Sequence, residues 1–282
     1  MKLPIFCSEC MRSLPEGKTV AGPVPPVKIA SFRNDGRYDV TCPQGHRTVV
    51  VLQNQGFELL FEIGACAIKD GYYREAVSSF AASLERFYEF FIRAALLNEA
   101  EDENARAKVI DKAWKPMSNR SEQQLGAFII LYLRECGEPP PLLDSERVSF
   151  RNAVVHKGRI PSRQEAVDYG QAVLDVIRPL LVTTQKKFSK GVQRRIFQHL
   201  GECARSGGGD GRAGTIGIRT IVSLSMPDAR NNSCSLEEAM ARMANWEDIL
   251  RKTAASEKSQ LGGDCQPGPI PGQPESPPAE DT

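Results

Sequence analysis

Four residues near the start of the chain have the types and spacing of metal ligands. Cys7 and Cys10 are separated by two residues, which places two thiols on one tight turn, and Cys42 and His46 offer a thiol and an imidazole from a second turn. A set of three cysteines and one histidine satisfies tetrahedral zinc and leaves no coordination position open for catalysis. The pattern therefore predicts a structural zinc ion held by these four residues.

This arrangement resembles the zinc ribbon families, in which a Cys-x-x-Cys turn faces a Cys-x-x-Gly-His or Cys-x-x-Cys turn. The second turn matches as Cys42-Pro43-Gln44-Gly45-His46. A ribbon of about 50 residues has little core, so metal binding would supply much of its folding free energy. The alternatives are exposed thiols or a redox pair, although no βαβ pattern surrounds Cys7. Zinc ribbons bind nucleic acids, bind protein partners or cap a domain, so the ribbon alone does not indicate the function.

Arg151, Asn152 and His156 form a second group of polar residues on one predicted helix. Asn152 and His156 are four residues apart and share a face, while Arg151 lies about 140° round the helix from His156. Phe150 and Val154 are expected to pack into the core and to anchor the helix. The three polar side chains could therefore edge one cleft from a rigid element.

Here the sequence resembles HEPN domains (higher eukaryotes and prokaryotes nucleotide-binding), helical bundles many of which carry arginine, a polar residue, three variable residues and histidine. The motif reads Arg151-Asn152-Ala153-Val154-Val155-His156, late in the predicted bundle, and the resemblance covers about residues 57–185. Some members carry a tyrosine two residues after the histidine. Gly158 occupies that position here, so a modification or antitoxin pairing that uses the tyrosine is not implied.

The resemblance implies an endoribonuclease, as in stress or phage-defence systems. RNA is cut without metal if a base takes the 2′-hydroxyl proton, a cation stabilises the phosphorane and an acid protonates the leaving oxygen. Histidine suits either proton transfer and arginine suits the phosphate. The family solution is a homodimer in which each subunit contributes Arg151 and His156 to a shared cleft, with Asn152 orienting the histidine or a phosphate oxygen.

The same motif also has a purely structural interpretation. A histidine near a helix end can stabilise the helix through its dipole and bind a carbonyl, which would leave Arg151 as a solvated surface residue. Some family members only bind or dimerise. The alternative function is therefore a non-catalytic zinc-ribbon and HEPN adaptor that binds nucleic acid or protein.

Lys186, Lys190 and Arg194 recur every four residues where the last long helix is expected to leave the bundle. Such a strip is either a solvated face or a surface that holds the backbone of a nucleic acid. His199 and Cys203 have no neighbours at metal-ligand spacing, so we interpret them as structural.

A short β ribbon and a series of helices must position these residues. Residues 27–29, 38–40 and 49–52 have strand patterns, with a tight turn at Asp35-Gly36. Helical periodicity begins near Phe57, and further helices are predicted at about 102–115, 122–136, 145–157 and from Ser162, which starts a capping box. The strongest helix carries an apolar stripe at spacings of three and four, made of Tyr73, Val77, Phe80, Leu84, Phe87, Phe91 and Ala95.

The predicted fold is mainly α with a small β module. Residues 1–53 form the zinc β ribbon, 54–199 the HEPN-like helical bundle, 200–255 a short α/β appendage of uncertain fold that could bind a protein partner, and 256–282 a proline-rich tail expected to be disordered. Within the appendage, residues 218–224 could form a strand and a helix could run from Ser235 to about residue 250.

The composition of the chain argues against a membrane-spanning protein, a secreted disulfide-bonded protein and several classes of enzyme. Hydrophobic residues make up 41% and charged residues 25% of the 282 residues, and no apolar run approaches the ~20 residues that span a membrane. The first apolar residues are too few for a signal peptide, and the cysteines are too scattered for a secreted disulfide framework, so we expect a cytoplasmic protein without membrane association. A glycine-rich phosphate loop, a His-Glu-x-x-His motif and a serine or cysteine nucleophile signature are all missing from the sequence.

Overall fold

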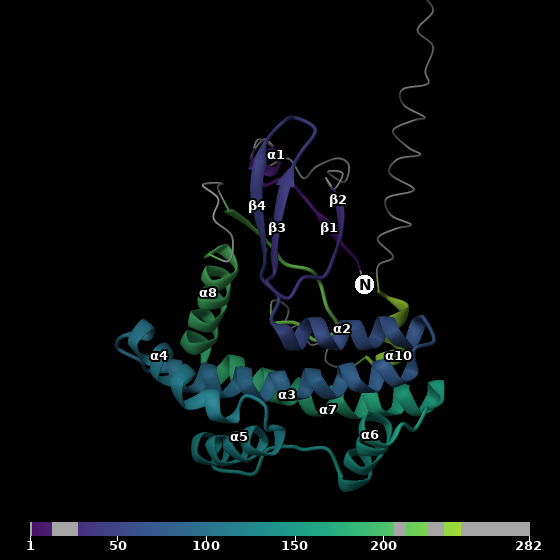
Figure 1. Cartoon of the computed structure of the whole chain (residues 1–282). Helices are drawn as coiled ribbons and strands as arrows, with labels where there is room; N and C mark the ends of the chain where they lie inside the picture. Colours follow the sequence, from purple (N-terminus) through teal and green to yellow (C-terminus); the bar gives the residue numbers. More distant parts are fainter. Residues whose placement is uncertain (1, 13–27, 206–212, 225–233, 244–282) are drawn as a thin grey trace, which may run out of the picture. The chain divides into compact units, whose positions relative to one another are not determined.

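The computed structural model describes residues 2–12, 28–205, 213–224 and 234–243 (Figure 1). The described residues all belong to one compact unit, and residues 245–282 lie outside the described residues. The described chain is mainly helical with a small β module near the N-terminus, as predicted. The tail expected at 256–282 lies outside the described residues. The helix expected to run from Ser235 to about residue 250 instead ends at Ala241, because the backbone N–H of Arg242 turns back to the carbonyls of Ala239 and Met240.

The β module consists of two small sheets. Strands β1 (Lys2–Ile5) and β2 (Lys28–Ser31) pair antiparallel, with Leu3 opposite Ala30. In the second sheet β3 (Arg37–Thr41) and β4 (Arg47–Leu52) also pair antiparallel, with Tyr38 opposite Val50. The strands expected around residues 38–40 and 49–52 are therefore confirmed. A third strand, β5 (Ala213–Ile216), lies parallel to β4 and comes from far along the chain.

The strand expected at residues 218–224 is wrong, because side chains satisfy the backbone of this segment in place of a neighbouring strand. Asn54 accepts a hydrogen bond from the backbone N–H of Ile218 at 2.8 Å and donates one to its carbonyl at 3.0 Å. Glu62 and Glu58 accept hydrogen bonds from the backbone N–H groups of Ile221 and Leu224, at 3.0 and 2.9 Å. A segment whose N–H groups are used in this way cannot form a regular β ladder.

The helices between residues 56 and 187 occupy the predicted positions, but the last long helix ends at Lys187 and a separate helix follows it, and a short helix at residues 8–12 is additional. Within the described residues none of them is both long enough and apolar enough to cross a membrane. Short α1 (Ser8–Arg12) follows β1, and the others are α2 (Gly56–Lys69), α3 (Tyr73–Asn98), α4 (Glu103–Trp114) with the 3-10 turn η1 (Lys115–Met117), α5 (Ser121–Cys136), α6 (Ser145–Lys157), α7 (Arg163–Lys187), α8 (Ser189–Arg205) and α10 (Leu236–Ala241).

Helix α3 is the centre of the helical part, with α2, α4, α5, α6, α7 and α8 all in contact with it (Figure 1). The predicted apolar stripe is buried apart from Tyr73 and Ala95, which are half-buried, and Phe80, Phe87 and Phe91 are fully inaccessible to solvent. The ring of Phe80 lies between Gly64 of α2 and Gly170 of α7, where a Cβ at either glycine would approach it within 2.7 Å. These close approaches explain why glycine occupies both positions.

The described parts of residues 200–255 contact both the β module and the helical bundle. Strand β5 extends the β3–β4 sheet, while α10 packs against α7 and α2. Helix α8 continues to Arg205, beyond the predicted end of the bundle, and contacts β4. The β module and the helical bundle are therefore joined through residues that follow the bundle in sequence.

Glu58 and Glu62 hold the 218–224 segment against α2 from inside the protein. Both side chains are buried, and both lie on α2 one turn apart. Burial raises the pKa of Glu58 from its ordinary 4.5 to about 7, although hydrogen bonds from the N–H groups of Gln55 and Leu224 act in the opposite direction. Burial raises the pKa of Glu62 to about 7 as well.

Replacing Glu58 with glutamine should change how stability depends on pH. The folded chain holds the Glu58 proton more tightly than the unfolded chain, so this contribution is complete below about pH 4.5 and is lost as the pH rises through about 7. Between about pH 5 and pH 8 the parent should lose roughly 2 to 3 kcal/mol more unfolding free energy than Glu58→Gln, measured by urea titration. Glu62 is present in both proteins, so its contribution cancels. Parallel pH dependences of parent and variant would contradict this account.

Candidate functional site

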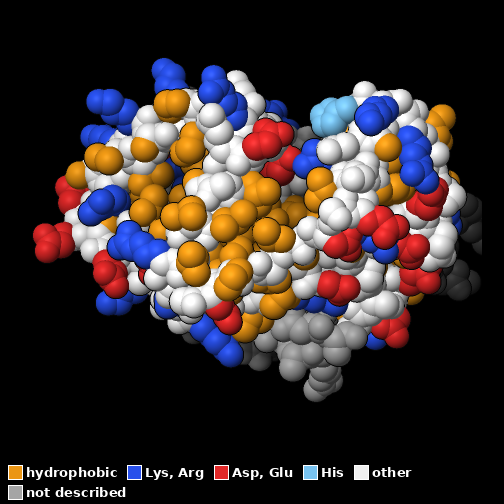
Figure 2. Space-filling model, turned by 90° about the horizontal axis from the view of Figure 1, so that it is seen from below, with side chains coloured by type: hydrophobic (Ala, Val, Ile, Leu, Met, Phe, Trp, Pro, Cys, Tyr) orange, Lys and Arg blue, Asp and Glu red, His pale blue; other side chains and the backbone are white. Residues whose placement is uncertain are grey.

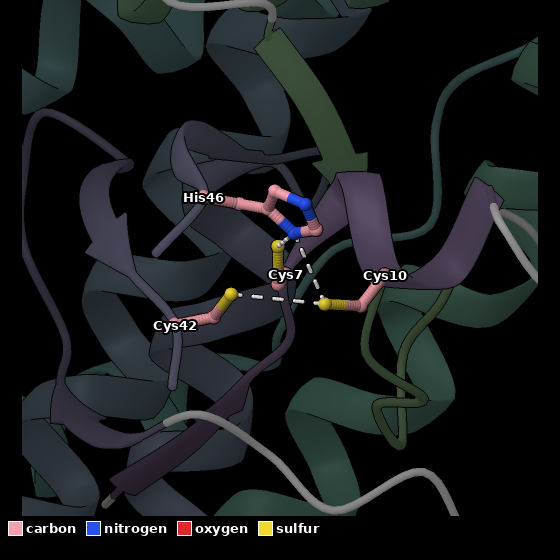
Figure 3. Close-up of side chains that lie close together, drawn as sticks. All are labelled: Cys7, Cys10, Cys42 and His46. Atoms are coloured by element: carbon pink, nitrogen blue, oxygen red, sulfur yellow. Dashed lines mark hydrogen bonds between the residues drawn. The ribbon is translucent and has the colours of Figure 1, made fainter. Parts of the chain in front are cut away.

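The four predicted metal ligands come together at one end of the β module (Figure 3). Cys7 follows β1 and Cys10 lies in α1, while Cys42 and His46 flank the turn between β3 and β4. That turn closes through a hydrogen bond from the N–H of Gly45 to the Cys42 carbonyl at 2.9 Å, with Gly45 at a φ of 80°. The four ligand atoms all lie within 4.8 Å of one another.

The separations of these atoms fit one tetrahedral ion. Ligands about 2.3 Å (sulfur) and about 2.0 Å (nitrogen) from a tetrahedral centre stand about 3.8 Å apart for two sulfurs and about 3.5 Å for sulfur and nitrogen. Cys10 Sγ lies 3.7 Å from Cys42 Sγ, and His46 Nδ1 lies 3.4 Å from Cys10 Sγ and 3.9 Å from Cys7 Sγ. The cluster could therefore bind a metal ion, with Nδ1 as the imidazole ligand.

Negative charge is shared unevenly among the thiols. Desolvation would raise the pKa of Cys7, but hydrogen bonds from the backbone of Cys10 and from neighbouring thiols lower it to about 6. Desolvation and the neighbouring Cys7 and Cys42 raise the pKa of Cys10 to about 12. Thiols this close compete for the ionised form, and a cation among them would remove that competition.

Arg151, Asn152 and His156 lie in the second half of α6, at the protein surface. Val154 is fully buried, and Phe150 packs against Tyr169 of α7 with ring centroids 5.7 Å apart, so the helix is anchored on its apolar side as expected. Asp144 caps the start of α6 through the N–H of Arg147. Gly158 ends the helix in the left-handed conformation, at a φ of 74°.

The three motif residues line one open cavity of about 690 Å³. Helix α6 forms one wall, and the others come from α3 and from the segment that leads into α5. The described lining contains no phenylalanine, tyrosine or tryptophan and is rich in amides, hydroxyls and charged groups, among them Glu85, Arg86, Ser118, Asn119, Ser121, Glu122 and Gln124. His156 is exposed, while Arg151 and Asn152 are half-buried.

Arg151 stands between two side chains that sequence reasoning missed. Its Nη2 lies 3.8 Å from Oε1 of Glu85 on α3. Tyr169 of α7 is the second neighbour: burial raises the pKa of its phenol to about 12, and the charge of Arg151 and a hydrogen bond with it act in the opposite direction. Glu85 and Tyr169 come from helices far from the motif in sequence, so no local spacing indicates them.

The wall opposite α6 is held by the buried side chain of Gln124. Its amide nitrogen donates to the carbonyls of Met117 and Ser118, at 2.8 and 2.9 Å, and its amide oxygen accepts a hydrogen bond from Arg86 at 2.9 Å. This network fixes the turn before α5. The side chains of Asn119 and Asn152, on opposite walls, have no hydrogen-bond partner among the described residues.

The predicted basic strip is divided between two helices. Lys186 and Lys190 are exposed, but α7 ends at Lys187 and α8 begins at Ser189. Arg194 is turned inward, because its Nη1 donates to the carbonyl of Leu97 at 2.6 Å, at the end of α3, and its Nε lies 3.3 Å from Glu103. Arg194 therefore stabilises the end of α3.

His199 and Cys203 lie together on the inner side of α8. His199 Nε2 is 3.1 Å from the carbonyl of Leu52 at the end of β4, and Cys203 Sγ is 3.7 Å from His199 Nδ1. Burial lowers the pKa of His199. These contacts join α8 to the β module, which agrees with a structural role.

The four-residue metal cluster predicts how many metal ions each chain binds. Dialysed protein should retain one metal ion per chain by elemental analysis, because four ligands from two turns hold the ion in a closed site. Cys42→Ser should release the ion, whereas Cys66→Ser, a change in α2 outside the cluster, should retain it. A parent protein without metal, or equal metal contents in the two variants, would remove the site.

Comparison with known proteins provides no family assignment. No family model, no curated protein and no solved structure matches the chain.

Proposed function

We propose that the protein is an endoribonuclease of HEPN type that cleaves RNA without a divalent metal. The observation that carries the proposal is the placement of Arg151, Asn152 and His156 around one open, polar cavity. A motif that faced the interior of its own bundle could not reach a substrate. His156 is exposed, so a substrate can reach it. Burial of Val154 holds α6 in place, which keeps the histidine in a fixed position for proton transfer.

In the proposed reaction, phosphorus exchanges its bond to the 5′-oxygen for a bond to the neighbouring 2′-oxygen of the same RNA chain. A neutral His156 accepts the proton of the 2′-hydroxyl, and the 2′-oxygen forms a bond to phosphorus while the bond from phosphorus to the 5′-oxygen breaks. A protonated histidine gives its proton to that leaving oxygen. The guanidinium of Arg151 stabilises the negative charge that develops on the non-bridging oxygens. The products are a 2′,3′-cyclic phosphate and a 5′-hydroxyl.

Two subunits would provide the two histidines, because one imidazole cannot be base and acid at the same time. The chain contains one histidine in the cavity, and its exposed position allows a second copy to approach. Figure 2 shows hydrophobic side chains gathered on the face seen from below, where α5 and α6 lie in Figure 1. Ile130 on α5 and Val148 on α6 are 67% and 38% exposed. Pairing of two copies through this face would bury apolar surface next to the shared site.

We also propose that the ion of the cysteine cluster is zinc and that the module around it is a zinc ribbon. Three sulfurs and one nitrogen are the ligands that structural zinc prefers, and they leave no position for substrate. The cluster joins α1 to the β3–β4 turn. Gly214 of β5 lies so close below α1 that a Cβ there would approach the Cβ of Ser8 within 2.4 Å. The ion would thus hold the N-terminal segment onto the sheet and take no part in cleavage.

Replacing His156 should abolish cleavage. His156→Ala should cut a mixed RNA substrate at least 100-fold more slowly than the parent in EDTA, because it loses proton transfer. Arg151→Ala should also be slow, since the phosphorane loses its cation. Arg147→Ala is the matched control on the same helix and outside the cavity, and it should retain activity. Parental rates for His156→Ala would leave the non-catalytic adaptor as the remaining function.

Mixing parent and His156→Ala chains should test the shared site. If one cleft needs a histidine from each subunit, mixed dimers carry a single histidine and are inactive, so an excess of His156→Ala chains should suppress the activity of a fixed amount of parent. The parent should sediment as a dimer in analytical ultracentrifugation. A strictly monomeric protein, or a parental rate that His156→Ala chains leave unchanged, would contradict a site built from two chains.

A further inference from the structure

Positive charge is concentrated in one short part of this chain. Residues 186–205, the end of α7 and all of α8, contain six basic residues and one acidic residue. The remaining residues contain 30 basic and 34 acidic side chains, so the rest of the protein is slightly acidic. A nearly neutral protein with one strongly basic segment has a local field that attracts an anionic partner to that segment.

Helix α8 presents a narrow outer face. Its inner side packs against α3, where a Cβ on Gly191 would come within 1.9 Å of the carbonyl oxygen of Ala94. Lys190, Gln193 and Phe197 are exposed and recur at spacings of three and four, so they lie along the outer face of the helix. Phe197 is 69% exposed, which leaves most of its ring in contact with solvent.

Some cationic side chains of residues 186–205 bind other groups of the protein, and others face solvent. Arg194 is held by the end of α3 and by Glu103, and Arg195 lies 3.4 Å from Glu202. The ammonium groups of Lys186 and Lys190 have no ion-pair partner among the described residues. The charge available to a partner is therefore carried by lysines, beside an exposed aromatic ring.

We propose that this outer face of α8, with Lys190 and Phe197, and Lys186 at the adjoining end of α7, binds single-stranded nucleic acid at a site separate from the cavity of Arg151 and His156. Lysines that face solvent neutralise backbone phosphates, and an exposed ring provides a platform on which an unpaired base stacks. Duplex bases are already stacked on one another, so the ring selects single strands. No residue of α8 lines the cavity, so the face is a second contact for an RNA chain and goes beyond the proposed cleavage.

The test measures binding in the His156→Ala background, so its result does not depend on whether the parent cleaves RNA. Fluorescence anisotropy with a labelled 20-nucleotide oligouridine should show binding that weakens as salt increases. Phe197→Ala should weaken binding at least fivefold, the lower end of what loss of one stacked base costs, while Phe197→Tyr should retain it. Tyr72→Ala, which removes an aromatic ring of nearly equal exposure (63%) at the start of α3, should bind like the parent.

Charge reversal provides the second arm. Lys190→Glu should lower the slope of log affinity against log salt by about 0.7 or more, because a phosphate contact is lost. Lys69→Glu, an exposed lysine at the end of α2, should leave the slope unchanged. The proposal is overturned if the oligouridine does not bind, if a duplex of equal length binds as tightly, or if Phe197→Ala and Lys190→Glu bind like the parent. It is equally overturned if Phe197→Ala dissociates an oligomer without changing RNA affinity, since the face would then be a protein interface.

Discussion

Burial of α3 is the constraint on which the rest of the structure depends. This 26-residue helix carries buried side chains around most of its circumference, so α2, α5, α6, α7 and α8 must all pack against it. Interlocking rings such as Phe91 and Phe128, whose centroids are 5.1 Å apart, fix these neighbours in position. Both walls of the cavity are thereby attached to one rigid element. The separation between the motif on α6 and the turn before α5 is set by α3.

The parts of the fold that could be predicted from sequence are those with a local signal. The apolar period of α3 and the capping box at Ser162 depend on neighbouring residues, and the metal ligands lie in two tight turns whose spacing is visible directly. Strand β5 has only four residues and pairs with β4, more than 160 positions earlier, so its place is decided by tertiary contact. The 218–224 segment has the composition of a strand, but carboxylates of α2 bind its N–H groups.

The same distinction applies to the candidate sites. The motif of Arg151, Asn152 and His156 can be located from sequence, but its surroundings cannot, because Glu85 and Tyr169 are brought to Arg151 by two other helices. Equal spacing of Lys186, Lys190 and Arg194 indicates one basic strip, whereas the break at Phe188 and the turn of Arg194 toward the end of α3 separate them. The periodicity of a sequence indicates which residues share one face of a helix. It does not indicate which other helices end close to that face in the folded chain.

The most direct test of the proposed active site is the chemistry of the RNA ends that the purified protein produces in EDTA. Transfer from the 2′-oxygen, with His156 and Arg151 as the reacting groups, must leave a 2′,3′-cyclic phosphate on one fragment and a 5′-hydroxyl on the other. Mass spectrometry of the fragments distinguishes these ends from those of metal-dependent hydrolysis. Cyclic phosphate ends would support the account. Intact RNA, or fragments with a new 3′-hydroxyl at the position of the cut, would contradict it.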